Sequence, residues 1–164
     1  MDQSGTDTPN FHIYDASAGS GKTYTLVRQY LIQLIRSKDP TYFKHILAIT
    51  FTNKATAEMK QRIIDSLLEF SSHEESDQPG SMMTEIMAQT GLTTPGLKSR
   101  SRLILEHLFR NYGLFSVETI DSFNHRLLRT FASDLKLPGQ FEVSLDTDEI
   151  LQMAVDQLID KAVT

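Results

Sequence analysis

The 164-residue sequence contains no cysteine. This absence excludes disulfides, thiolate-bound zinc and cysteine nucleophiles, and it suits a protein of the reducing cytoplasm. The sequence also has no apolar run near the roughly 18 residues that a membrane-spanning helix needs. Residues 1–10 are polar, unlike a secretory signal peptide, and we expect them to form a flexible tail. Together these absences predict a cytoplasmic protein that makes no contact with a membrane.

The composition is that of a globular domain, with 40% hydrophobic and 23% charged residues, so wholesale disorder is excluded. The net charge of −5 is distributed unevenly along the chain. Residues 1–62 carry eight Lys/Arg and five Asp/Glu, a net charge of +3, whereas residues 63–164 carry eight and sixteen, a net charge of −8. An anionic ligand is therefore expected on the N-terminal part of the chain.

The octapeptide ASAGSGKT nearly fits the phosphate-loop pattern G-x-x-x-x-G-K-[ST] and departs from it only at the first glycine. Small residues let the backbone wrap closely around a phosphate, and the N-terminus of the following helix faces the same charge. In this pattern Lys22 reaches the outer phosphates and the Thr23 hydroxyl binds Mg²⁺. The whole segment is therefore predicted to bind a nucleotide: Ala16, Ser17, Ala18, Gly19, Ser20, Gly21, Lys22 and Thr23.

Strands and helices are expected to alternate along the chain. Apolar or alternating runs predict strands at 11–16, 45–50 and 116–120. Apolar residues at helical spacing predict helices at 22–37, 54–70, 81–89, 97–110, 121–134 and 146–162. An exposed loop is expected at 71–80 and a turn at 93–96. Strands separated by helices in this way predict an α/β fold with a parallel sheet and right-handed crossovers.

A second polar signature, TFTNK, follows the apolar strand at 45–50, at the sheet edge where α/β proteins bind ligands. Phe51 offers a ring on which a base can stack, and its neighbours offer hydrogen-bond donors for phosphate oxygens: Thr50, Thr52, Asn53 and Lys54. The residues alone leave a structural alternative open, in which Phe51 belongs to the core and Thr52 or Asn53 caps a helix.

Three segments in order, ASAGSGKT, TFTNKATAEMKQRI and VETIDSFNHRLLRTFA, resemble motifs of the UvrD/Rep group of superfamily-one DNA helicases. The variants ASAGSGKTYT and ATAEM are closer to the RecB and AddA helicase–nuclease branch. The resemblance covers nearly the whole chain, and three motifs in the family's order are far more specific than any one of them.

The resemblance implies a RecA-like P-loop NTPase sheet flanked by helices, present here as a partial motor domain over residues 11–122. Residues 123–164 would be helices leading into an inserted helical subdomain. ATP and Mg²⁺ are the implied cofactors, and single-stranded DNA would be bound by residues 50–54 and by Thr119, Ser122 and Phe123. The implied function is ATP-driven translocation on single-stranded DNA in repair or recombination. The implied partners are the remaining helicase domains of the same parent chain and helicase–nuclease subunits.

The sequence departs from the family at three points. Asp121 replaces a histidine of the third motif, so a DNA contact there is expected from Thr119, Ser122 or the helix N-terminus, with Asp121 as an N-cap. Gln3 is not flanked by the residues of the glutamine motif with which the family recognises adenine. Tyr24, next to the loop, could pack against a base or against other side chains of the protein. The D-E-x-Q motif is missing. Since the numbering begins at a methionine, we expect an N-terminal fragment that binds nucleotide but does not unwind DNA.

Two other functions remain open. The chain could be a complete small P-loop nucleotide kinase or NTPase with Asp121 as its magnesium aspartate, although Glu118 would then occupy a strand that should be buried. It could also be a module that binds nucleotide or DNA without catalysis. A small basic cluster on the helix after the third strand could meet a DNA backbone or form a solvated face: His125, Arg126 and Arg129.

Overall fold

The computed structural model describes residues 13–14, 21–74, 78–132, 134, 151–153, 155–156 and 158–159. The chain divides into two units, Met1–Thr119 and Ile120–Thr164. In its described residues the fold is mostly helical with a small parallel sheet, as a partial α/β domain would be.

The first unit is built from helices around a two-stranded sheet. Its described helices are α1 (Lys22–Arg36), α2 (Asn53–Ser72), α3 (Ser81–Thr90) and α4 (Thr94–Arg110). Short 3₁₀ helices cover Tyr42–His45 and Tyr112–Leu114. Strands β1 (Ala48–Thr50) and β2 (Val117–Thr119) pair in parallel, with Ala48 opposite Val117 and Thr50 opposite Thr119. The helices between the strands therefore form one long crossover connection.

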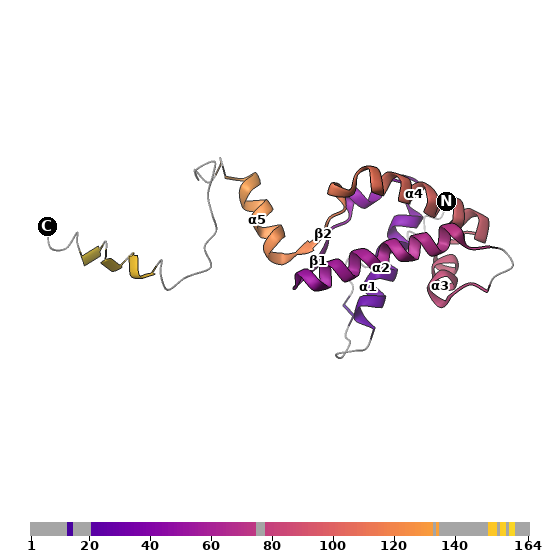
Figure 1. The fold of residues 1–164 in the computed structure, drawn as a ribbon, viewed down its shortest axis with the longest axis horizontal. Coiled ribbons are helices and arrows are strands. Elements are labelled where there is room, and N and C mark those ends of the chain that lie inside the picture. The colour runs from indigo at the N-terminus through magenta and orange to yellow at the C-terminus, as the bar shows by residue number, and fades with distance from the viewer. Residues whose placement is uncertain are drawn as a thin grey trace, which may run out of the picture. The chain divides into compact units, whose positions relative to one another are not determined.

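The core of this unit lies where α1, α2 and α4 pack on one another, while α3 packs on α1 (Figure 1). Each of the three core helices contributes fully buried apolar side chains: Leu31, Leu34, Ile63, Leu67, Ile104 and Leu108. Burying each one stabilises the fold by about 1.5–3 kcal/mol. The apolar stripes that predicted α1 and α2 are confirmed, because most of their residues at helical spacing are buried, although Leu26 of α1 is 50% exposed.

The second unit contains α5 (Ile120–Thr130), in which no side chain is buried. The described residues between 151 and 159 are also helical, as the sequence predicts. No helix in the described part of the chain is long and apolar enough to cross a membrane.

The sequence predictions are wrong at several element ends. The strand expected at 45–50 begins only at Ala48, because the chain before it forms the 3₁₀ helix Tyr42–His45. The turn expected at 93–96 is the start of α4, where Pro95 is tolerated because the first turn of a helix needs no backbone donor. Of the strand expected at 11–16, Ile13 and Tyr14 are not in a strand and are exposed, and the other four residues lie outside the described part.

Candidate functional site

Gly21 forms the junction between the predicted phosphate loop and α1. Its φ of 83° and ψ of 15° place it in the left-handed region, which glycine adopts without steric strain. A Cβ atom at this position would meet nothing within 4 Å, so the backbone conformation, and not crowding, favours glycine here. The carbonyl of Gly21 accepts the first helical hydrogen bond from Thr25 N at 2.9 Å. Residues 16–20 of the predicted loop lie outside the described part.

Lys22 and Thr23 are the first two residues of α1. Lys22 is exposed and Thr23 is half-buried. The first backbone amides of a helix have no partner within it and carry a partial positive charge, which favours a bound anion. The first turn of α1 contains no acidic residue that would compete for this position. The three described residues of the predicted site, 21–23, therefore form a helix N-terminus of the kind that can bind a phosphate group.

The next residue, Tyr24, contacts α3. Its hydroxyl donates to Oε1 of Glu85 at 3.1 Å, and Arg28 one turn later donates to Oε2 of the same carboxylate. The hydrogen bond from Arg28 is the main reason why the pKa of Glu85 is lowered, and the same bond raises the pKa of Arg28. No sequence pattern signals this contact, since Tyr24 and Glu85 are 61 residues apart.

Thr50 and Thr119, one from each segment predicted to contact DNA, lie at the same edge of the sheet, because they end paired parallel strands in register. The Thr50 hydroxyl shares a hydrogen bond of 2.6 Å with the Thr56 hydroxyl and donates to the Thr52 carbonyl at 3.2 Å. These bonds connect the end of β1 to the first turns of α2. Thr119 is only 6% exposed, which places it within the edge of the sheet.

The junction between β1 and α2 decides whether Phe51 belongs to the core and whether Thr52 or Asn53 caps the helix. Phe51 is 86% exposed, so its assignment to the core is wrong. Thr52 is the N-cap of α2, because its Oγ1 accepts a hydrogen bond from Ala55 N at 3.1 Å. Asn53 and Lys54 follow in the exposed first turn of α2. An exposed ring beside polar side chains and a helix N-terminus can hold one strand of nucleic acid.

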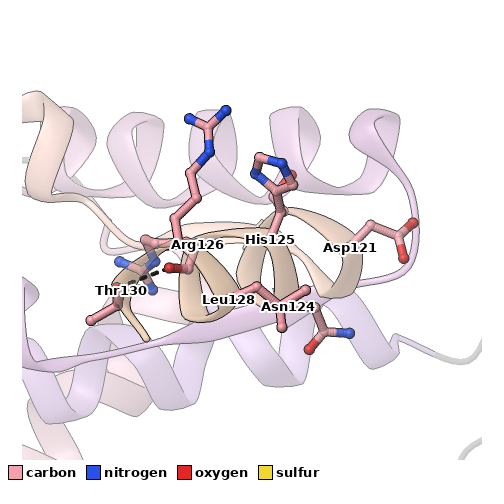
Figure 2. A pocket seen from close by; sticks show the side chains of 8 residues that line it. Asp121, Asn124, His125, Arg126, Leu128 and Thr130 are labelled. Atoms are coloured by element: carbon pink, nitrogen blue, oxygen red, sulfur yellow. Dashed lines mark hydrogen bonds between the residues drawn. The ribbon is translucent and has the colours of Figure 1, made fainter. Parts of the chain in front are cut away.

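The remaining predicted DNA residues lie on α5. Ser122 is exposed and Phe123 is half-buried, with the Arg126 guanidinium 5.8 Å from its ring centroid. Figure 2 shows His125 and Arg126 on one side of α5, with Asn124 and Leu128 on the other.

The expectation that Asp121 is an N-cap is wrong, because α5 begins at Ile120. Asp121 lies inside the first turn, where its negative charge suits the helix dipole. Among the described residues, no group of three His, Asp or Glu side chains is arranged to hold a metal ion.

The UvrD/REP helicase N-terminal domain matches residues 8–164, almost the whole chain. The chain belongs to this family. The match confirms the resemblance that the three motifs predict, and it places the start of α1, the junction of β1 with α2 and the start of α5 within one UvrD/REP helicase N-terminal domain.

Individual relatives within the UvrD/REP family carry helicase–nuclease names. The A subunit of the ATP-dependent helicase/nuclease from Bacillus pumilus is 28% identical over 149 residues, which cover 89% of this chain. The relative of the same name from Desulforudis audaxviator is 30% identical over 134 residues, or 81% of the chain. The RecBCD enzyme subunit RecB of Chlamydia pneumoniae is 47% identical over 53 residues, or 32% of the chain. The chain spans 10%, 9% and 5% of the lengths of these three relatives. No solved structure matches the chain.

Proposed function

We propose that this chain is the N-terminal ATP-binding part of an ATP-dependent DNA helicase of the RecB/AddA type. The observation that carries the proposal is the start of α1, where left-handed Gly21 leads into Lys22 and Thr23 in a chain of the UvrD/REP family. Residues 11–122 would be part of a RecA-like motor domain, and residues 123–164 would lead into its inserted helical subdomain. The parent protein would act in DNA repair or recombination in the cytoplasm.

ATP and Mg²⁺ are the ligands that fit the described residues. Residues 16–23 would enclose the phosphates, Lys22 would bind the outer ones, and the Thr23 hydroxyl would bind Mg²⁺. Bound Mg²⁺ would neutralise phosphate charge. The absence of acidic side chains from the first turn of α1 and the exposure of Lys22 support this assignment.

Single-stranded DNA is the proposed macromolecular substrate. The exposed Phe51 ring would stack on a base, while Thr50, Thr52, Asn53 and Lys54 would surround the adjoining phosphates. Thr119, Ser122 and Phe123 would add contacts from the third motif. The names of the relatives support partners of two kinds, which are the remaining helicase domains of the parent chain and helicase–nuclease subunits.

The alternative of a small nucleotide kinase is less well supported. It requires Asp121 as a magnesium ligand, whereas Asp121 is an exposed residue in the first turn of α5. Membership of the UvrD/REP family also gives the TFTNK segment a function that a kinase would not.

Calorimetry with Mg-ATP tests the nucleotide site. We expect the chain to bind Mg-ATP and the Lys22→Ala variant to lose about tenfold or more in affinity, since a hydrogen bond to a charged group is worth about 1.5–3 kcal/mol. Lys44→Ala, which removes an exposed lysine of the 3₁₀ helix Tyr42–His45, is the matched control and should bind normally. No binding by the folded chain, or equal binding by Lys22→Ala, would contradict the proposal.

The isolated chain should hydrolyse ATP negligibly, because the sequence has no D-E-x-Q motif to bind magnesium and activate water. A phosphate-release assay with single-stranded DNA present measures this. Turnover at a helicase-like rate that Lys22→Ala abolishes would show that the chain carries a complete catalytic site.

A further inference from the structure

Glu85 of α3 accepts hydrogen bonds from two residues of α1. Tyr24 Oη donates to Oε1 at 3.1 Å, and Arg28 Nη1 donates to Oε2. The Tyr24 hydroxyl also lies 3.5 Å from the hydroxyl of Ser81, the first residue of α3. Both oxygens of one carboxylate are therefore used, and both connect α3 to the first two turns of α1.

The first turn of α1 has no side-chain cap. The N-cap residue is Gly21, which has no side chain to accept a hydrogen bond from the first amides. Tyr24 directly follows Lys22 and Thr23, so its hydroxyl is attached to the turn that carries them. Fixing Tyr24 against α3 fixes this turn from outside the helix.

The charges of Arg28 and Glu85 add to this contact between α1 and α3. Arg28 and Glu85 are partly withdrawn from water, with side chains 29% and 38% exposed. The Nε atom of Arg28 is buried and has no hydrogen-bond partner in the part of the chain that the structure describes. Glu85 pairs its charge with Arg28, and because both side chains stay partly exposed, solvent screens part of this attraction.

We propose that Glu85 is a positioning residue for the nucleotide site. Through Tyr24 and Arg28 it holds the first turn of α1, and with it Lys22 and Thr23, in the orientation that phosphate and magnesium binding require. This inference rests on the proposed function of the same turn. It makes α3, which lies outside all three helicase-like motifs, a determinant of nucleotide affinity. By linkage, a bound nucleotide should in turn stabilise the contact between α1 and α3.

Two conservative variants test the proposal in the full 164-residue chain. Tyr24→Phe removes only the hydroxyl, and Glu85→Gln leaves one carbonyl oxygen where two carboxylate oxygens accept. The matched controls are Tyr112→Phe, at a tyrosine outside the cluster, and Glu106→Gln, at a carboxylate paired with Arg110 on the surface of α4.

The first measurement is amide hydrogen exchange without nucleotide. We expect the Thr25 amide, which donates to Gly21 O, to exchange about three- to tenfold faster in Tyr24→Phe and Glu85→Gln than in either control. Exchange in α2 and α4 should stay unchanged. Unchanged exchange at Thr25, or an equal increase throughout the first unit, would overturn the proposal.

The second measurement is Mg-ATP affinity by calorimetry, with each variant confirmed as folded by urea titration. Tyr24→Phe and Glu85→Gln should bind about three- to tenfold more weakly than the controls. If both variants bind Mg-ATP as tightly as the wild type, the positioning role is overturned, since a purely structural contact leaves the affinity of the folded chain unchanged. If the wild-type chain binds no Mg-ATP, the proposed function fails, and the exchange at Thr25 still decides whether Glu85 fixes the turn.

Discussion

Two buried hydroxyl groups in the first unit have no hydrogen-bond partner among the described residues. Ser101 is fully buried in α4, and Tyr30 of α1 is 4% exposed, with its ring edge against Phe115. Burial raises the pKa of Tyr30, so this hydroxyl stays neutral. An unsatisfied buried polar group costs about 1–3 kcal/mol, and each hydroxyl therefore opposes the packing around it.

Replacing Ser101 by alanine should stabilise the chain. Ser101→Ala removes the unpartnered oxygen and improves helix propensity, so the free energy of unfolding should rise by about 1 kcal/mol. Urea denaturation measures this, with Ser99→Ala on the exposed side of α4 as the control for propensity alone. A gain no larger than that of Ser99→Ala would mean that the Ser101 hydroxyl is satisfied in solution.

Among the elements, the junction between β1 and α2 combines a helix cap with the proposed DNA contact. Thr52 caps α2, and Thr50 is bonded to Thr52 and Thr56, so the junction is rigidly connected to both elements. Phe51 lies between these anchored residues and is 86% exposed. A large exposed ring on a fixed backbone is available for stacking and contributes little to the fold.

Phe51→Ala should therefore separate binding from stability. We expect the affinity for an oligo(dT) strand at low salt to fall about tenfold, since base stacking is worth about 1–3 kcal/mol per base. The urea midpoint should not change. Fluorescence anisotropy measures the binding, with Phe109→Ala as the control because Phe109 is 56% exposed on α4. Equal losses in the two variants, or no loss, would rule out Phe51 as a stacking platform.

The sequence predicted an element well where its bounds depend on neighbouring residues, and less well where they depend on packing or on ambiguous turn residues. The start of α1 was predicted to the residue and its end to within one residue, because a stripe of apolar residues at helical spacing is a local property. The start of α4 was missed, since Pro95 and Gly96 fit a turn as well as a first helical turn. The strand ending at Thr50 is shorter than predicted. The apolar residues Ile46 and Leu47 fit a strand pattern, although they directly follow a 3₁₀ helix and are not part of β1.

In the candidate site, too, local features could be predicted from the sequence and contacts between distant residues could not. Gly21, Lys22 and Thr23 could be predicted as site residues from the sequence motif alone, since their spacing within one loop carries the chemistry. Pairing of β1 with β2, which aligns Thr50 with Thr119, could be expected from the alternation of strands and helices. The contact of Tyr24 with Glu85 could not, because it depends on how α3 packs against α1.

For the molecule as a whole, the N-terminal part of the sequence has a net positive charge and the rest a net negative charge. Residues 1–62 carry a net charge of +3 within a total of −5, and both Lys22 and Lys54 belong to this positive part. The proposed nucleotide and DNA contacts thus use the part of the sequence that attracts anions, while the acidic remainder keeps the total negative.

Acid should weaken the fold through two carboxylates. The pKa of Asp39 is lowered by hydrogen bonds from the Thr41 amide and hydroxyl, and the pKa of Glu85 is lowered chiefly by Arg28. Because the folded chain binds these protons less readily than the unfolded chain, their stabilisation is complete above the ordinary carboxyl pKa of about 4. It is lost as the pH falls through the lowered values.

Urea titrations between neutral pH and about pH 3 measure this loss. Asp39→Asn and Glu85→Gln should each flatten the dependence of unfolding free energy on pH, while the exposed control Glu106→Gln should follow the wild type. Slopes that match the wild type in both variants would show that other carboxylates dominate the acid response.

The chain between α2 and α3 has no regular structure at residues 73–74 and 78–80. A single cleavage between Pro79 and Gly80 would leave α1, β1 and α2 on one fragment and α3, α4 and β2 on the other. All three main contacts, α2 with α4, α1 with α3 and β1 with β2, would then join the two fragments. The first unit is thus suited to fragment complementation: if Glu85 positions the proposed nucleotide site as we infer, the fragment with Lys22 would regain full affinity for nucleotide only when the fragment with Glu85 reassembles with it.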